Sequence, residues 1–350
     1  MKKILLPVLV PSLIMTGFAE AATVYSNKEG TKLDLYGRVE AKIGNEWTTE
    51  HNSAANLTGR LGVDAQQKID DTFTVLGKME WQVNTQKNDT ESSDDTWKIR
   101  YAYAGVEANK YGKAMIGRTR NPMYQWMSIT DRYMNFTSNV YSNWVGTRID
   151  SSYQWNRQDG TIQYEYLGHN VDLRAAYLMG NGAGDSTVDN GYMGSLGYTI
   201  KTTLFDKVLT IKPVIAWQKL TKDPKNTTLS GNYTDYIQEG VGVRVSYDKA
   251  YLGVNVGKQK YERLNASDRK YDALDTLAEY WFTKQVALRG GYSQLIEKEN
   301  DDYAHRKQWL IEAEYKLKKD IHLSTTYIRD ERDDYESPEN LWVLGVRYDF

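Results

Sequence analysis

The decisive stretch is LWVLGVRYDF, residues 341–350, in which every second residue from Trp342 to Phe350 is apolar or aromatic. In an extended chain, successive side chains point to opposite faces. Five apolar or aromatic side chains therefore share one face: Trp342, Leu344, Val346, Tyr348 and Phe350. This strand runs to the last residue and needs pairing partners, which a sheet that closes on itself supplies. The stretch therefore predicts a closed all-β barrel.

The other end of the sequence predicts export. Residues 1–3 are cationic at Lys2 and Lys3, residues 4–18 are apolar, and Ala19-Glu20-Ala21 has the form of a cleavage site. We therefore expect residues 1–21 to be a cleaved signal peptide and residues 22–350 to form one domain. Residues 22–350 contain no apolar stretch near the roughly 20 residues that a membrane helix needs.

Segments of about ten alternating residues, separated by polar turns, recur along residues 22–350. This pattern is typical of strands in an outer-membrane barrel, which place apolar residues toward lipid and polar ones toward the lumen. Residues 31–44 show it, with leucines and valines opposing charged residues. By the same parity, residues 97–103 would place Trp97, Ile99, Tyr101 and Tyr103 outward. Seventeen segments are counted, and residues 148–180 are ambiguous because NRQDG and GHN could each be a turn or a bulge.

Aromatic residues gather near the ends of these segments, where amphipathic rings would form girdles at the two membrane surfaces. Members of this set are Trp81, Trp97, Trp155, Tyr164, Tyr166, Trp217, Tyr280, Phe282, Trp309, Tyr327 and Trp342. A soluble sandwich would also alternate, but its apolar faces must meet in one core, and such domains seldom need so many strands. A transmembrane antiparallel β-barrel is therefore favoured.

Three stretches resemble one family. ATVYSNKEGTKLDLYGRVEAKIG (residues 22–44), RYAYAGVEANKYGKAMIGRTRNP (100–122) and LGVRYDF (344–350) are similar to general, trimeric porins of Gram-negative outer membranes, the matrix-porin or osmoporin type. The resemblance implies about 16 strands, a homotrimer, localisation to the outer membrane, and a third loop folded into the lumen. It also implies that Tyr348 and Phe350 form a signal read by the outer-membrane barrel assembly machinery.

The third loop can be located from the residues themselves. Residues 119–145 show no sustained alternation, and a loop of this length within a compact domain is usually functional. Its aromatic residues, among them Tyr124 and Trp126, are too numerous for a segment exposed to water. We expect these rings to pack on the barrel wall, with contact to a sugar as the alternative.

A size-limited pore sorts solutes by fixed charge across a narrow gap. Four arginines match, by local motif, the basic constriction residues of the family, and parity places them toward the lumen: Arg38 in LYGR, Arg60 in LTGRLG, Arg100 in KIRYAYAG and Arg148 in VGTR. We expect them to form the basic side of the pore constriction, although lumen-facing arginines could also only solvate the wall.

The acidic side departs from the family pattern. The family's loop carries one carboxylate in a Thr-Asp pair and a second, four residues on, within a Pro-Glu-Phe-Gly-Gly-Asp motif. Asp131 in ITDR matches the first, but Asn135 stands at the second position and Arg132 adds a positive charge. Other acidic residues predicted to face the lumen could offset this: Glu40, Glu80, Asp150 and Glu165. We expect weak cation selectivity or a mild anion preference.

The predicted function is passive diffusion of small hydrophilic solutes and ions. A porin selective for oligosaccharides or anionic nutrients is the alternative, and a barrel enzyme is the remote one, since no G-x-S-x-G or comparable motif is present. No catalytic residue, cofactor or metal site is predicted, and the net charge of −2 does not suggest nucleic acid. Acidic runs near residues 89–95, 297–302 and 330–336 are expected to be solvated outer loops, with bridging of lipopolysaccharide phosphates through divalent cations as the alternative. Lipopolysaccharide and outer-membrane lipid are also expected partners of the barrel.

Overall fold

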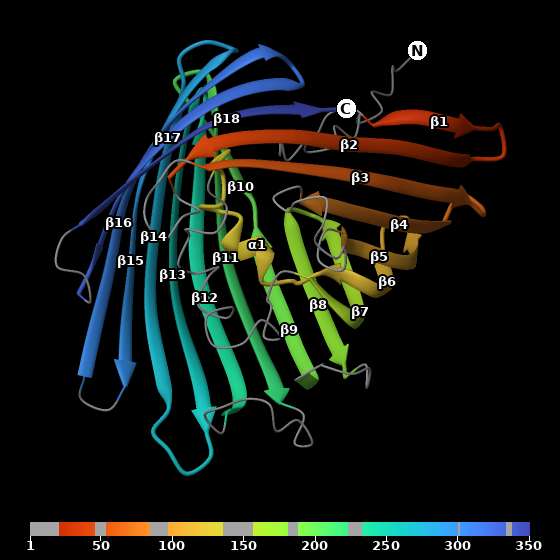
Figure 1. Ribbon diagram of the computed structural model, residues 1–350. Coiled ribbons are helices and arrows are strands. Elements are labelled where there is room, and N and C mark those ends of the chain that lie inside the picture. The colour runs from red at the N-terminus through yellow and green to blue at the C-terminus, as the bar shows by residue number, and fades with distance from the viewer. Residues whose placement is uncertain are drawn as a thin grey trace, which may run out of the picture.

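The computed structural model describes residues 21–45, 54–84, 97–135, 157–180, 188–222, 233–299, 302–333 and 338–350. One antiparallel sheet dominates this part of the chain (Figure 1). Its strands are β1 (Ala22–Ser26), β2 (Thr31–Gly44), β3 (Ala54–Lys68), β4 (Phe73–Asn84), β5 (Trp97–Ala108), β6 (Gly112–Arg120), β7 (Arg157–Gly168), β8 (Val171–Met179), β9 (Val188–Tyr198), β10 (Ile200–Leu204), β11 (Lys207–Lys222), β12 (Tyr233–Tyr247), β13 (Ala250–Arg263), β14 (Arg269–Trp281), β15 (Val286–Glu299), β16 (Asp302–Lys318), β17 (Ile321–Arg332) and β18 (Glu339–Asp349).

The sheet closes on itself, because β18 pairs with β2 and each further strand pairs with the next. Two strands of the wall consist of two segments each. β1 and β18 pair with successive parts of β2, and β9 and β10 pair with successive parts of β11. With each of these pairs counted once, the eighteen described segments form a closed barrel of sixteen strands. The prediction of a barrel with about sixteen strands is confirmed.

Alternation separates an outer from an inner face. On β11, Ile215 is 55% exposed and Trp217 43%, whereas Val214 is 1% and Ala216 8% exposed. β18 behaves in the same way, and its five predicted outward residues, from Trp342 to Phe350, are all exposed. A belt of exposed apolar and aromatic side chains therefore surrounds the barrel, as a hydrocarbon solvent requires.

The ambiguous stretch near residue 160 contains one turn and one irregular strand. His169 and Asn170 both have positive φ angles (51° and 65°) and join β7 to β8, as in the tight two-residue turns of hairpins. Residues 157–160 instead belong to β7, where Gly160 has a φ of 67°, and the register with β6 shifts nearby. GHN is therefore the turn, and RQDG lies within a bulged strand.

A second irregularity corrects the parity predicted for residues 97–103. The register between β4 and β5 shifts, since Trp81 pairs with Ile99 but Glu80 pairs with Tyr101. Arg100 is the extra residue, and an extra residue reverses the facing of those after it. Tyr101 consequently points inward, and the guanidinium of Arg157 lies 4.5 Å from its ring centroid. The expectation of an outward Tyr101 and Tyr103 was wrong.

After β6, the described residues 121–135 leave the wall and include the helical turn α1 (Tyr124–Met127). Figure 1 shows α1 within the ring of strands. Its buried side chains form a cluster with Val214 and Ala216, on the side of β11 opposite to the exposed belt. We call residues 121–135 the inner segment. In the described part of the chain, no helix has the length and hydrophobicity to cross a membrane.

Candidate functional site

The inner segment is seated on glycines of the wall. Trp126 is 0% exposed, and its indole lies against Gly240 of β12 and Gly257 of β13. Ile129 occupies the next seat, formed by Gly242 and Gly253. A Cβ atom at any of these four positions would overlap the segment. The glycines therefore create the groove into which the segment fits, and Trp126 is its largest buried anchor.

Wall side chains also bind the backbone of the inner segment. Asn255 of β13 donates to the carbonyl oxygen of Trp126 at 3.0 Å, and the hydroxyl of Tyr251 donates to that of Ile129 at 2.6 Å. Further along, the amide of Met134 donates to Glu312 of β16 at 2.8 Å. These bonds satisfy polar backbone groups that would otherwise be costly to bury.

Asn135 ends the described part of the segment and is buried, with 6% of its surface exposed. Its side chain donates to the hydroxyl of Thr326 at 2.9 Å and accepts from Ser324 at 3.0 Å, both on β17. Lys42 of β2 donates to its carbonyl oxygen at 3.1 Å. Asn135 thus anchors the segment to the wall, and the expectation that it faces the arginines was wrong.

Three of the four predicted arginines lie on neighbouring strands. Arg38 of β2 and Arg60 of β3 are direct cross-strand partners, and Arg60 in turn pairs with Gln82 of β4. Arg100 of β5 reaches the same Gln82, which accepts from its Nη1 at 2.7 Å and from Nε of Arg60 at 3.2 Å. A row of guanidinium groups therefore runs from β2 to β5 along the inner face of the wall. Arg148 lies outside the described residues.

Carboxylates compensate this row only in part. Asp349 of β18 accepts from Nε of Arg38 at 2.8 Å, and Glu80 of β4 accepts from Nε of Arg100 at 2.5 Å. Arg60 has no ion pair with a carboxylate in the described part of the chain, and its Nε donates to the neutral Gln82. The wall therefore presents an excess of positive charge near Arg60.

Two further arginines belong to this region and were not singled out from the sequence. Arg120 is the last residue of β6, and its guanidinium carbon lies 3.2 Å from the ring centroid of Tyr124 in α1. Arg157 opens β7 and stacks over Tyr101. The alternation of Arg118 and Arg120 in GRTRNP is the sequence signal that could have identified Arg120. Arg157 lies in the part of the sequence, residues 148–180, whose strands could not be assigned.

Asp131 is the carboxylate of the inner segment that meets these arginines. Its Oδ2 accepts from the hydroxyl of Tyr124 at 2.9 Å, while its Oδ1 is buried and has no hydrogen-bond partner among the described residues. Burial raises the pKa of Asp131 to about 6, and the positive charges of Arg120, Arg157 and Arg60 act in the opposite direction. Asp131 is therefore a group of this site that titrates near neutral pH.

Arg132 does not add a free positive charge. Its Nη2 donates to Glu279 of β14 at 2.7 Å, and its guanidinium lies 4.2 Å from the ring centroid of Tyr251. Glu279 also accepts from Arg289 of β15 at 2.6 Å. Arg132 is thus tied to a buried network on the wall, and the excess charge lies at Arg60, Arg120 and Arg157.

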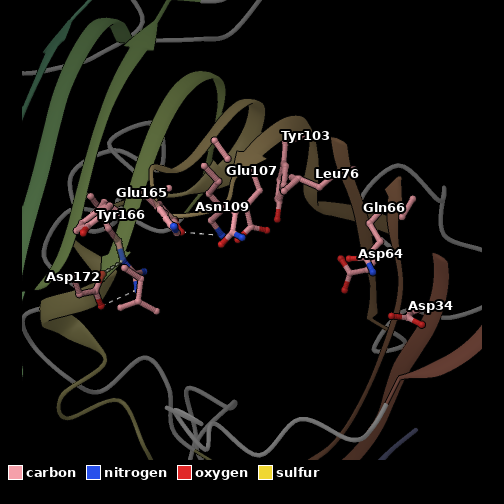
Figure 2. A pocket seen from close by; sticks show the side chains of 18 residues that line it. Asp34, Asp64, Gln66, Leu76, Tyr103, Glu107, Asn109, Glu165, Tyr166 and Asp172 are labelled. Atoms are coloured by element: carbon pink, nitrogen blue, oxygen red, sulfur yellow. Dashed lines mark hydrogen bonds and ion pairs between the residues drawn. The ribbon is translucent and has the colours of Figure 1, made fainter. Parts of the chain in front are cut away.

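A cavity of about 560 Å³ lies against strands β2 to β8, near their tight turns (Figure 2). Figure 2 shows Asp34 and Asp64 at one side of it and Glu165 and Asp172 at the other. Each of these four carboxylates has a cationic partner: Lys32, Lys78, Lys113 and Arg174, in that order. This cavity is therefore polar and its charges are largely matched, in contrast to the arginine row.

The last residues complete the wall. The amide of Phe350 donates to the carbonyl oxygen of Gly37 at 3.0 Å, and the amide of Gly37 donates back at 2.7 Å. The rings of Tyr348 and Phe350 lie side by side on the outer face, with centroids 5.8 Å apart. Both residues proposed from the sequence as an assembly signal are therefore at the seam between β18 and β2.

Comparison with known proteins identifies the family. The family model for Gram-negative porins matches residues 8–350. The chain belongs to the Gram-negative porin family. Over 217 residues, this porin is 32% identical to the outer membrane protein Omp-EA of Erwinia amylovora, and the match covers 57% of this chain and 54% of that protein. The porin therefore spans about half the length of this relative.

Other matches are longer. Over 326 residues, the porin is 28% identical to outer membrane porin C of Salmonella typhimurium, covering 86% of this chain and 82% of that protein. The solved structure of Salmonella typhi OmpF in complex with daunomycin superposes with a TM-score of 0.79 at 18% identity, covering 93% of this chain and 99% of that one. The resemblance predicted from the sequence is confirmed, and the porin is a multi-strand barrel of the Gram-negative outer membrane.

Proposed function

We propose that this porin is a passive diffusion pore for small hydrophilic solutes and ions, and that the loop predicted at residues 119–145, of which the structure describes residues 119–135, forms its constriction. The observation that carries the proposal is the row of arginines on β2, β3 and β5, which the inner segment faces with Asp131. Fixed charges across a narrow gap order water and sort solutes by size and charge. Arg148 is proposed as a further member of the basic side.

The charge balance supports a mild anion preference. Near the inner segment, the positive groups outnumber the negative ones. The positive groups are Arg60, Arg100, Arg120 and Arg157, and the negative groups are Asp131 and Glu80. Arg38 and Arg132 are matched by Asp349 and Glu279. This balance supports an excess of positive charge at the proposed constriction, and the effect should be strongest at low salt, where screening is weakest.

The alternative of a porin selective for sugars gains no support from the largest aromatic residue of the segment. Trp126 is fully buried against glycines, so its indole cannot stack on a passing solute. The alternative of anionic nutrients keeps its support from the excess of arginine. We propose a channel without enzymatic activity, and membership in a family of channels supports this.

We further propose that the porin functions as a homotrimer in contact with lipopolysaccharide and outer-membrane lipid. Its similarity to outer membrane porins and the exposed apolar belt support this assembly. We also propose that Tyr348 and Phe350 are read by the barrel assembly machinery. Their exposure on the outer face of the closing strand makes them accessible to a partner before closure.

Planar-bilayer recording under a gradient of potassium chloride tests the pore and its selectivity together. Discrete, long-lived conductance steps with a small reversal potential of the sign for anions are expected. Arg60→Gln should move the reversal potential toward cations, because it removes an unmatched charge. A purified, folded barrel that produces no conductance would refute the proposal, and strong cation selectivity would refute the charge argument.

A further inference from the structure

Arg120 and Arg157 form an unusual pair. They are direct cross-strand partners at the end of β6 and the start of β7. Directly opposed residues in antiparallel strands have Cβ atoms about 5 Å apart, and like charges in this position destabilise the pair. A protein tolerates such an arrangement where an opposite charge lies between the two groups, or where it binds a ligand that supplies one.

Another opposed pair, Arg38 and Arg60, has a carboxylate beside it, on the β18 side of Arg38. These residues are also direct cross-strand partners, and Asp349 accepts from Arg38 at 2.8 Å. For Arg120 and Arg157, no ion pair with a carboxylate is found in the described part of the chain. Arg157 is only 6% exposed, and the Nε atoms of both arginines are buried without a hydrogen-bond partner among the described residues.

Two tyrosines hold the guanidinium planes instead, and one donor of Arg157 is used in a hydrogen bond to the hydroxyl of Tyr101. Arg120 lies over Tyr124 of α1 at 3.2 Å, and Arg157 lies over Tyr101 of β5 at 4.5 Å, each measured from the guanidinium carbon to the ring centroid. Stacking on a ring face leaves the N–H donors of a guanidinium at its edge. Such an edge presents a rigid fork that matches the oxygens of phosphate or a carboxylate.

We propose that Arg120 and Arg157, with Arg60 nearby, form a binding site for a small tetrahedral oxyanion such as sulfate or phosphate. The buried, unpartnered Nε of Arg157 and the opposed charges of the pair are the features that such an anion would satisfy. The inference rests on the proposed pore function, since the anion reaches the site from the lumen. It adds a saturable step to the diffusion of oxyanions.

Asp131 competes with the anion for the same charges. The charged groups that act on Asp131 are Arg120 of β6, Arg157 of β7 and Arg60 of β3, and the hydroxyl of Tyr124 donates to it. When Asp131 is ionised, it supplies part of the missing negative charge. Oxyanion affinity should therefore increase when Asp131 is neutral, whether by protonation or by replacement with Asn.

Block of the chloride current by sulfate in planar bilayers tests the site. At low potassium chloride concentration, sulfate should reduce the current through wild-type trimers in a saturable manner, and inorganic phosphate should act alike. Arg120→Gln should raise the half-blocking sulfate concentration about tenfold, because one charge-assisted contact is lost. Arg157→Lys keeps the charge but loses the planar fork, and should also raise it.

Lys113→Gln is the matched control. It removes one positive charge from the same strand, β6, at the other end, where Lys113 pairs with Glu165 at 2.9 Å. Its half-blocking concentration should stay near that of the wild type. Migration as a heat-dissociable trimer verifies that each variant has folded.

The outcomes separate the two proposals. A wild-type protein without conductance refutes the pore itself. A conducting pore on which sulfate has no saturable effect refutes the oxyanion site and leaves the pore intact. A conducting pore in which Lys113→Gln weakens the block as much as Arg120→Gln shows only a diffuse lumen charge, and also refutes the site.

Discussion

Replacing Trp126 with alanine should release the inner segment from the wall without unfolding the barrel. The indole is fully buried against Gly240 and Gly257. Truncating a buried aromatic residue of this size costs about 3–5 kcal/mol, which corresponds to a change of about a hundredfold or more in the ratio of docked to undocked segment. The backbone bonds of the β-strands are untouched, so the folded barrel and the proposed trimer should resist heat as those of the wild type do.

Single-channel recording in planar bilayers measures the result. Trp126→Ala should give a larger and noisier current than the wild type, because a loosened segment fills less of the lumen. Gly240→Val should give the same phenotype with the indole intact, since a side chain there would occupy the seat of Trp126. Gly290→Ala is the control. Its added Cβ would be 3.8 Å from the nearest atom, the carbonyl oxygen of Leu310.

The reasoning fails if Trp126→Ala and Gly240→Val both fold as trimers and both keep the conductance and noise of the wild type. The inner segment would then not determine the cross-section available to ions. An increase in Gly290→Ala equal to that of Gly240→Val would show that any substitution on the wall has this effect, and that the seat has no special role.

Three other perturbations test other parts of the structure. Lowering the pH from 7 to 5 takes Asp131 through its pKa of about 6, so the ionised fraction of its carboxyl group falls and the reversal potential should move toward anions. The variant Asp131→Asn should show this shifted reversal potential already at pH 7, and its reversal potential should no longer respond to pH. Asn135→Glu would bury a carboxylate beside Glu312, whose Oε2 lies 3.2 Å from the backbone nitrogen of Asn135. This variant should therefore reduce the yield of folded trimer instead of shifting ion selectivity. A normal yield together with a reversal potential shifted toward cations would contradict this expectation. Phe350→Ala should lower the amount of folded trimer in the outer membrane far more than it lowers synthesis, as measured by comparing folded and total protein in membrane fractions.

The barrel could be predicted because alternation is a local property. The pattern of side chains within each strand of the wall indicates which side of that strand faces lipid, as residues 341–350 illustrate. The reversal at Arg100 could not be predicted in this way. A bulge depends on the partner strand, and the shift becomes visible only when Glu80 and Trp81 are paired with β5.

The candidate site was predicted in part for a similar reason. Local motifs indicated Arg38, Arg60 and Arg100, and the aromatic composition indicated that the inner segment packs on something. Asn135 was misplaced because its partners, Thr326 and Ser324, lie almost 200 positions later in the chain. Spacing from Asp131 cannot tell whether a side chain points to the gap or to the wall behind it.

The inner segment also has a mechanical consequence. Its hydrogen bonds join it in succession to β8, β13, β16, β17 and β2, so one short stretch of chain is fastened along more than half of the circumference. A barrel without such an internal segment can flatten into an ellipse as its strands slide past one another. With the inner segment bound, flattening would have to stretch or break these hydrogen bonds together. We therefore expect the aperture to be stiff, and permeation to be decided by which solutes fit it.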